Sequence, residues 1–255
     1  LNLADLPSDI IRQIIGSGLE SIDNMRMISN RWNSLLKDRQ SLPPIKRFYL
    51  YYYNDGRVVP MVSIESRYAT YFGVNEWSKS TSGQFQEFSK HFDIDEDYTE
   101  LKKSLSKLFA RSSRVNIFKF VNIDVDYSLL ILPMLRDICI HELEMGGLNG
   151  FSKNEECLIT NFIGAHSVQK VVLNFTSTST WNDSKPGLAK FLPLAARDLS
   201  SIDLVYGWSE RERNERFDEN IRDIWKARVS ELAEETQLTI HSEVCEYALR
   251  INIEK

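Results

Sequence analysis

The first forty residues carry apolar side chains every three or four positions, which is the spacing of one face of an α-helix. Pro7 stands where a first helical turn tolerates a missing N–H group. The Gly-Ser-Gly stretch 16–18 ends this helix, and Ser21 is a suitable cap for a second one. A third apolar repeat surrounds Trp32. The pattern predicts three short helices between residues 3 and 39, a unit whose small core needs a partner for stability.

The apolar pattern changes from helical to alternating after residue 44. Segments 45–53 and 58–64 are rich in aromatic and β-branched residues, which are typical of strands. Asp55-Gly56 lies between them, and this dipeptide between two such segments predicts a β-hairpin. The polar stretch 75–83 predicts a loop.

From about residue 101 onward, strand-like and helix-like segments alternate. Such alternation predicts parallel strands joined by right-handed crossovers. Ile138, Val171, Ile202 and Leu238 hold equivalent strand positions about 30 to 36 residues apart, within the range of stacked repeats. The expected strands are 115–121, 137–143, 170–175, 201–206, 237–241 and 248–253, and the expected helices are 127–135, 154–165, 188–196 and 220–235.

Two arrangements of these units stay open. Helices could cover one face of a curved sheet, or they could cover both faces of a compact layer. Strand alternation buries one set of residues, such as Ile140, Leu173 and Leu204. The intervening residues would form a partner-binding surface in the first arrangement and part of the core in the second. They are Lys119, His141, Val172, Asn174, Asp203, Val205, Thr239 and His241.

The amino-acid composition excludes several classes of protein function. Hydrophobic residues make up 42% of the 255-residue chain, enough for a real core, and the net charge is −5. This acidic balance counts against a dedicated nucleic-acid binder. The three separated cysteines, Cys139, Cys157 and Cys245, predict neither a disulfide framework nor a zinc site, and they favour a reducing cytoplasmic or nuclear compartment. The apolar runs are too short to span a bilayer, so no membrane partner is expected.

No pattern typical of a catalytic or metal site emerges. Segment 141–144 reads His-Glu-x-Glu, whereas a zinc protease needs His-Glu-x-x-His on a helix. Segment 93–98 begins like a calcium loop but has tyrosine where that loop needs glycine. We therefore expect a non-catalytic protein without a metal or other cofactor.

A basic stretch precedes the first repeat strand. A solvated helix face explains it, and contact with RNA is the other interpretation. It comprises Lys102, Lys103, Lys107, Arg111 and Arg114.

The amino-terminal helices contain Leu6-Pro7-Ser8-Asp9-Ile10-Ile11 and then Met25-Arg26-Met27-Ile28-Ser29-Asn30-Arg31-Trp32. Together these segments resemble the F-box, which docks a protein onto the Skp adaptor of a cullin–RING ubiquitin ligase. The other interpretation is a helical cap on the larger domain. The resemblance implies that Leu6, Pro7, Ile10, Ile11 and Ile14 contact the Skp adaptor, and that Met25, Ile28 and Trp32 hold the helices together.

With this resemblance, the pattern predicts an α+β or α/β fold in three parts. Residues 1–42 form a three-helix F-box, and 43–100 form a β-hairpin and linking segment. Residues 101–255 form an irregular, leucine-rich-repeat-like βα-repeat domain with mostly parallel strands. The aromatic hairpin and divergent repeats also resemble the expanded F-box families of nematodes.

The resemblance implies a non-catalytic, substrate-recognition adaptor of an SCF-type ubiquitin ligase. Its partners would be a Skp-type adaptor, a cullin through that adaptor, and a protein substrate held by the repeat domain. Two alternatives stay open. One is a ligase-independent F-box scaffold or regulator that holds a fixed protein partner, and the other is an RNA-associated protein that uses the basic stretch.

Overall fold

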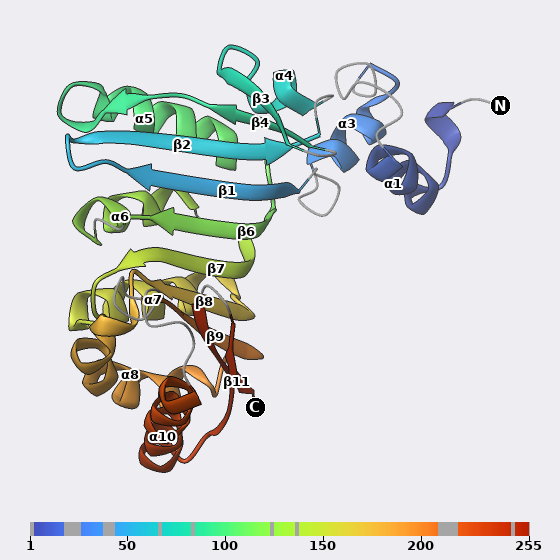
Figure 1. Ribbon diagram of the computed structural model, residues 1–255. Coiled ribbons are helices and arrows are strands. Elements are labelled where there is room, and N and C mark those ends of the chain that lie inside the picture. The colour runs from blue at the N-terminus through green and yellow to red at the C-terminus, as the bar shows by residue number, and fades with distance from the viewer. Residues whose placement is uncertain are drawn as a thin grey trace.

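The structure is a computed structural model dominated by one large β-sheet (Figure 1). It describes residues 3–17, 27–37, 44–65, 68–82, 85–122, 125–135, 138–208, 219–245 and 248–254.

The described elements alternate between strands and helices through most of the chain. The strands are β1 (Ile45–Tyr52), β2 (Arg57–Ile64), β3 (Ser78–Ser82), β4 (Phe85–Ser89), β5 (Phe92–Asp93), β6 (Arg114–Val121), β7 (Cys139–Leu148), β8 (Lys170–Phe175), β9 (Ser201–Gly207), β10 (Thr239–Val244) and β11 (Ala248–Glu254). The α-helices are α1 (Ser8–Ser17), α3 (Asn30–Lys37), α4 (Ala69–Phe72), α5 (Ile94–Phe109), α6 (Val125–Ile131), α7 (Lys153–His166), α8 (Trp181–Ala195) and α10 (Glu219–Thr236). Short 3-10 helices are η1 (Leu3–Asp5), η4 (Leu132–Leu135) and η5 (Thr178–Thr180). Within the described ranges, none of these helices has both the length and the apolar character needed to cross a membrane.

The described strands form a single sheet in the order β10-β11-β9-β8-β7-β6-β1-β2-β4-β3, with β5 paired to β2. Strands β1, β6, β7, β8 and β9 are parallel and form its centre. Antiparallel strands flank this centre on both sides. The expected mixed α/β fold with a parallel central sheet is therefore confirmed.

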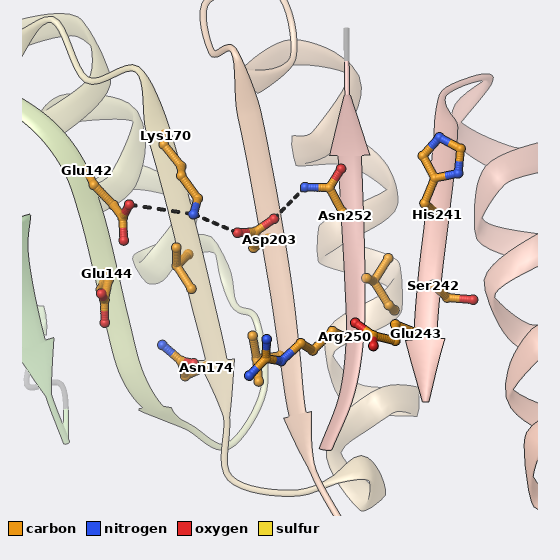
Figure 2. A pocket seen from close by; sticks show the side chains of 13 residues that line it. Glu142, Glu144, Lys170, Asn174, Asp203, His241, Ser242, Glu243, Arg250 and Asn252 are labelled. Carbon is orange, nitrogen blue, oxygen red and sulfur yellow. Dashed lines mark hydrogen bonds and ion pairs between the residues drawn. The ribbon is translucent and has the colours of Figure 1, made fainter. Parts of the chain in front are cut away.

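The helices between the parallel strands lie on one face of the sheet. Each crossover from β6 to β9 leads to the next strand in the same direction, so right-handed connections place α6, α7 and α8 on the same side. Figure 2 shows helices behind the sheet, while the labelled side chains project from its other face. Of the two arrangements that the sequence left open, the described part of the chain has the one-sided arrangement.

The helix-covered face of the sheet forms the core. Phe118, Leu143, Leu173 and Leu204 are fully buried on successive parallel strands. The ring of Phe118 also contacts Phe48 of β1, with ring centroids 4.9 Å apart. Strand pairing and the core therefore continue from the hairpin into the parallel strands that follow residue 100.

The expected β-hairpin is confirmed by the antiparallel pairing of β1 with β2. Gly56 in its turn has φ of +83°, a conformation that glycine adopts without a side-chain clash. The Asp55 carboxylate accepts a 2.8 Å hydrogen bond from Arg57 Nε and closes the turn. Asp55 and Gly56 thus form the turn that the sequence predicted between the two strands.

The expectation of a loop at 75–83 was wrong, because β3 lies there. Its serine-rich sequence has little strand preference of its own, but β4 supplies an antiparallel partner along its whole length. Pairing in the sheet outweighs the local preference of these residues.

The repeat spacing had predicted that the last two strands continue the parallel series. They do not. Strand β11 pairs antiparallel with both β9 and β10, so β11 lies between them. The connection between β10 and β11 spans only residues 245–247, which is too short for the crossover that parallel strands require. Leu238 is consequently not a repeat position.

Helix α8 begins at Trp181, well before the expected start at residue 188. Pro186 lies inside this helix, where it cannot donate a backbone hydrogen bond. The Trp181 indole is buried against Tyr206 and Trp225, with ring centroids 5.4 and 5.5 Å away. Burial of this large side chain stabilises the first turns of the helix.

The described amino-terminal helices, α1 and α3, pack on each other beyond one end of β1 and β2 (Figure 1). Ile11 and Trp32 are buried between this pair and the main core. The Trp32 indole donates a 2.8 Å hydrogen bond to the Leu3 carbonyl, and Arg31 donates one of 2.7 Å to the Ser8 hydroxyl. The expected second helix falls largely in residues 18–26, which lie outside the described residues.

Candidate functional site

Polar side chains cover the sheet on the face opposite the helices, which we call the open sheet face (Figure 2). Strand pairing places these residues in rows across neighbouring strands, such as Lys119 beside Glu144 and Asp203 beside Asn252. The open sheet face comprises Lys119 on β6, Glu142 and Glu144 on β7, Lys170, Val172 and Asn174 on β8, Asp203 and Val205 on β9, Arg250 and Asn252 on β11, and Thr239, His241 and Glu243 on β10.

A chain of polar contacts runs across the middle of the open sheet face. Lys170 Nζ lies 2.9 Å from Asp203 Oδ2 and 3.5 Å from Glu142 Oε2, so one ammonium group serves two carboxylates (Figure 2). Asn252 donates a 2.6 Å hydrogen bond to the other carboxylate oxygen of Asp203. A separate pair joins Lys119 Nζ to Glu144 Oε2 at 2.6 Å. These contacts link side chains from five adjacent strands.

The chain of contacts sits in partly desolvated surroundings. Burial raises the pKa of the Glu142 carboxyl, and the neighbouring Glu144 raises it further, although Lys170 opposes both effects. The hydrogen bond to Asp203 raises the pKa of the Lys170 ammonium, so this lysine stays charged. The side chains of Glu142 and Glu144 are each only 18% exposed. Burial and the neighbouring carboxylate thus disfavour the charged form of Glu142.

A depression of about 550 Å³ lies over β7, β8, β9, β11 and β10. Val172 and Val205 form part of its floor. The Nδ2 atom of Asn174 is buried there without a hydrogen-bond partner. Arg250 extends from β11 across β9 toward Asn174 (Figure 2), and within the described residues it makes no ion pair. The depression thus offers hydrogen-bond donors that the described chain does not use.

An aromatic flank borders the open sheet face on β1. Tyr49 lies beside Lys119 in the parallel register, and the Lys119 ammonium is 5.9 Å from the centre of its ring. The rings of Tyr49 and Tyr51 meet edge to face, 6.2 Å apart. Burial raises the pKa of the Tyr51 hydroxyl. Aromatic and charged surfaces are therefore contiguous, as is common where proteins bind proteins.

The structure brings most of the expected surface residues together. Val172, Asn174, Asp203, Val205 and His241 line the depression. Lys119 adjoins it through its ion pair with Glu144. Thr239 is on the same face of β10 but lies outside the lining.

His141 is exposed on β7 but does not line the depression, whereas Glu142 and Glu144 of the same strand do. Strict alternation from Ile140 had placed His141 on the open face. The strand is irregular there, since Ile140 and Leu143 are both fully buried with two residues between them. The apolar spacing of Ile140, Leu143 and Met145 is the sequence signal that could have found the two glutamates.

The expected adaptor-contact residues differ in exposure. Pro7 and Ile10 are exposed, the latter by 37%, while Leu6 and Ile14 are partly buried. Ile11 is fully buried in the core, so in this arrangement it packs the helices and cannot contact a partner. Of the residues expected to hold the helices together, Trp32 is buried, Ile28 packs against the core, and Met25 lies outside the described residues.

The basic stretch does not form one continuous surface. Arg111 donates to the backbone carbonyl of Tyr71 and lies over its ring, so its guanidinium group is already engaged. Lys103 pairs with Glu100 at 3.6 Å on α5. This arrangement favours the solvated-helix interpretation over RNA contact.

The described residues offer no evident site for metal chemistry. Among them, no group of three or more histidine, cysteine or acidic residues is placed to hold a metal ion. The three cysteines are free, and none of them lines the depression. Comparison of the chain with protein-family models, with curated proteins and with solved structures gives no match.

Proposed function

We propose that this chain is a substrate-recognition adaptor of an SCF-type ubiquitin ligase. Its amino-terminal helices bind a Skp-type adaptor, and its open sheet face binds a protein substrate. The observation that carries the proposal is the one-sided sheet: in the described residues, helices cover one face, and partly buried polar side chains line the other.

The open sheet face suits a protein partner because of its extent and chemistry. Its residues come from successive strands of one sheet, the type of extended surface that stacked-repeat proteins use for binding. The depression lies over β7 to β10, and Lys119 of β6 separates it from the aromatic flank of Tyr49 and Tyr51. Four carboxylates in its lining oppose binding of a phosphate backbone, which counts against the RNA-associated alternative.

The amino-terminal unit supports the adaptor role through its unpartnered apolar side chains. Leu3 is 49% exposed, Ile10 37% and Met27 86%. Three large exposed hydrophobic residues in one small helical unit are typical of an interface with another protein. Together with the resemblance of this unit to the F-box, they support the proposal that this end of the molecule binds the Skp-type adaptor.

In this role the chain supplies proximity rather than chemistry. Holding a substrate near the loaded ubiquitin-conjugating enzyme makes a bimolecular transfer effectively intramolecular. The transfer itself belongs to other subunits of the ligase.

Co-expression with a Skp-type adaptor, followed by size-exclusion chromatography, tests the proposal. We expect the wild-type chain and the adaptor to elute as one complex. Replacement Ile10→Asp introduces a charge on the exposed apolar surface and should separate the two proteins. Leu194→Asp makes the same kind of change at an exposed leucine on α8 and should leave the complex intact. Separate elution of the folded wild-type proteins would contradict the proposal and favour the interpretation that the helices are a cap on the larger domain.

A further inference from the structure

The middle of the open sheet face holds more negative than positive charge. Three carboxylates, Glu142, Glu144 and Asp203, share two ammonium groups, Lys119 and Lys170. Lys170 divides its charge between two of them, and its distance to Glu142 is the longest in the group. With Glu243 of β10 and Arg250 of β11 included, the face carries four carboxylates and three cations, so one negative charge is left without a cation of its own.

The uncompensated charge falls on Glu142. Its carboxyl lies near Glu144 on its own strand and near Lys170 on β8, which also pairs with Asp203 on β9. Lys119 on β6 forms its ion pair with Glu144 instead. Burial and the neighbouring carboxylate raise the pKa of Glu142. A cation placed beside Glu142 and Glu144 would favour the charged form of both carboxyls and so oppose this increase in pKa.

A second, independent observation points to an occupant beside these carboxylates. Asn174, on the next strand, keeps a buried Nδ2 donor without a partner, and Arg250 reaches over β9 toward it. Buried donors of this kind are normally satisfied. A main-chain carbonyl of an extended segment is an acceptor that fits between two strands of a sheet surface.

We propose that a basic segment of a protein partner occupies the depression, with an arginine or lysine side chain between Glu142 and Glu144 and a main-chain carbonyl facing Asn174. The inference rests on the proposed function, because it names the chemistry of the substrate that the open sheet face binds. The fourth carboxylate of the lining, Glu243, extends the preference for positive charge to the outer strand β10.

The test measures binding of fluorescent peptide pools to the full chain by fluorescence anisotropy. Three pools of equal length share a mixed neutral background and differ at a central arginine, glutamine or glutamate. We expect the arginine pool to bind most tightly. Because a hydrogen-bonded charge contact contributes about 1.5–3 kcal/mol, Glu142→Gln should weaken its binding about tenfold or more.

Matched variants separate the contact from general electrostatics. Glu234→Gln removes the same charge from the exposed surface of α10 and should leave binding of the arginine pool unchanged. Asn174→Leu should weaken all three pools alike, since it removes a donor to the peptide backbone. Binding of the arginine pool should also weaken as the pH falls, because Glu142 then becomes protonated, and Glu142→Gln should reduce this dependence.

Equal binding of the arginine and glutamine pools, a preference for glutamate, or no binding of any pool would overturn the inference. So would an equal loss of binding in Glu142→Gln and Glu234→Gln. None of these results bears on complex formation with the Skp-type adaptor, which reports on the amino-terminal helices. The two proposals therefore fail separately.

Discussion

His166 shows how a single polar residue is accommodated in the core. It lies in the last turn of α7, is 3% exposed, and its Nδ1 is 3.1 Å from the Ile138 carbonyl oxygen. The Nε2 atom is buried without a partner, and the ring packs on Phe162. Burial lowers the pKa of this imidazole below its ordinary value. The neutral ring is thus the form that the folded chain accepts.

This environment predicts a pH dependence of stability. The unfolded chain binds a proton at His166 near pH 6.5, while the folded chain resists it, so the free energy of unfolding should decrease as the pH falls below about 6.5. The slope from one such group approaches about 1.4 kcal/mol per pH unit. Urea unfolding from pH 7.5 to 5.5 measures it.

Replacement His166→Phe should flatten this slope, and His241→Phe, which changes an exposed imidazole, should retain it. An unchanged slope in His166→Phe would assign the acid sensitivity to other groups.

At the scale of single elements, the sequence predicted the bounds of a strand best where its apolar pattern was clear. Strands β8 and β9 follow the expected ranges closely: buried positions alternate throughout β9, and β8 is a short apolar segment in which only Val172 interrupts the alternation. Strand β7 extends to Leu148, beyond the expected end at residue 143, and so includes Gly146 and Gly147. The register shifts between Gly146 and Leu148, and Gly147 adopts φ of +79°. The charged row was misplaced by one residue on this strand for a related reason: local irregularity is not visible in an alternating pattern.

Packing of α8 on the segment before α7 supplies an element-scale prediction. A Cβ atom at Gly187 would overlap the Phe151 carbonyl oxygen, which is backbone and cannot turn away. We expect Gly187→Ala to destabilise the chain by about 1–3 kcal/mol, as overpacking does in cores. Chemical denaturation of both proteins measures the difference.

Gly164 on α7 provides the control for this substitution. A Cβ atom there meets no neighbour within 4 Å, and the backbone is helical. Gly164→Ala should therefore stabilise the chain by about 0.5–1 kcal/mol through the higher helix preference of alanine. Equal effects at the two positions would show that α8 does not approach the segment before α7 this closely.

At the scale of the whole molecule, the sheet joins parts that the sequence had divided. Strand β1 pairs with β6, and Phe48 and Phe118 share one core. Sequence patterns report on local periods, so they could not show that the hairpin adds to the parallel strands. The strand order β9-β11-β10 could not be predicted either, because local sequence patterns do not report which distant segments pair.

Two fragments test this continuity. A fragment of residues 101–255 should fail to show a cooperative thermal transition, because β6 loses its pairing with β1 and the buried face of Phe118 is exposed. A fragment of residues 44–255 retains the sheet and should unfold cooperatively, at a lower temperature than the full chain because Ile11 and Trp32 are lost from the core. Circular dichroism follows both. Cooperative unfolding of the shorter fragment would support a domain boundary at residue 100.

The antiparallel strands at the two ends of the sheet have a consequence for how copies of the molecule behave at high concentration. A sheet that ends in a long apolar strand invites another chain to extend it, which leads to fibres and precipitates. Here the terminal strand β3 reads Ser-Lys-Ser-Thr-Ser, and the other terminal strand, β10, carries His241 and Glu243 exposed to solvent. Charged and hydrophilic margins of this kind discourage self-association and leave the broad surface of the sheet free for a different protein.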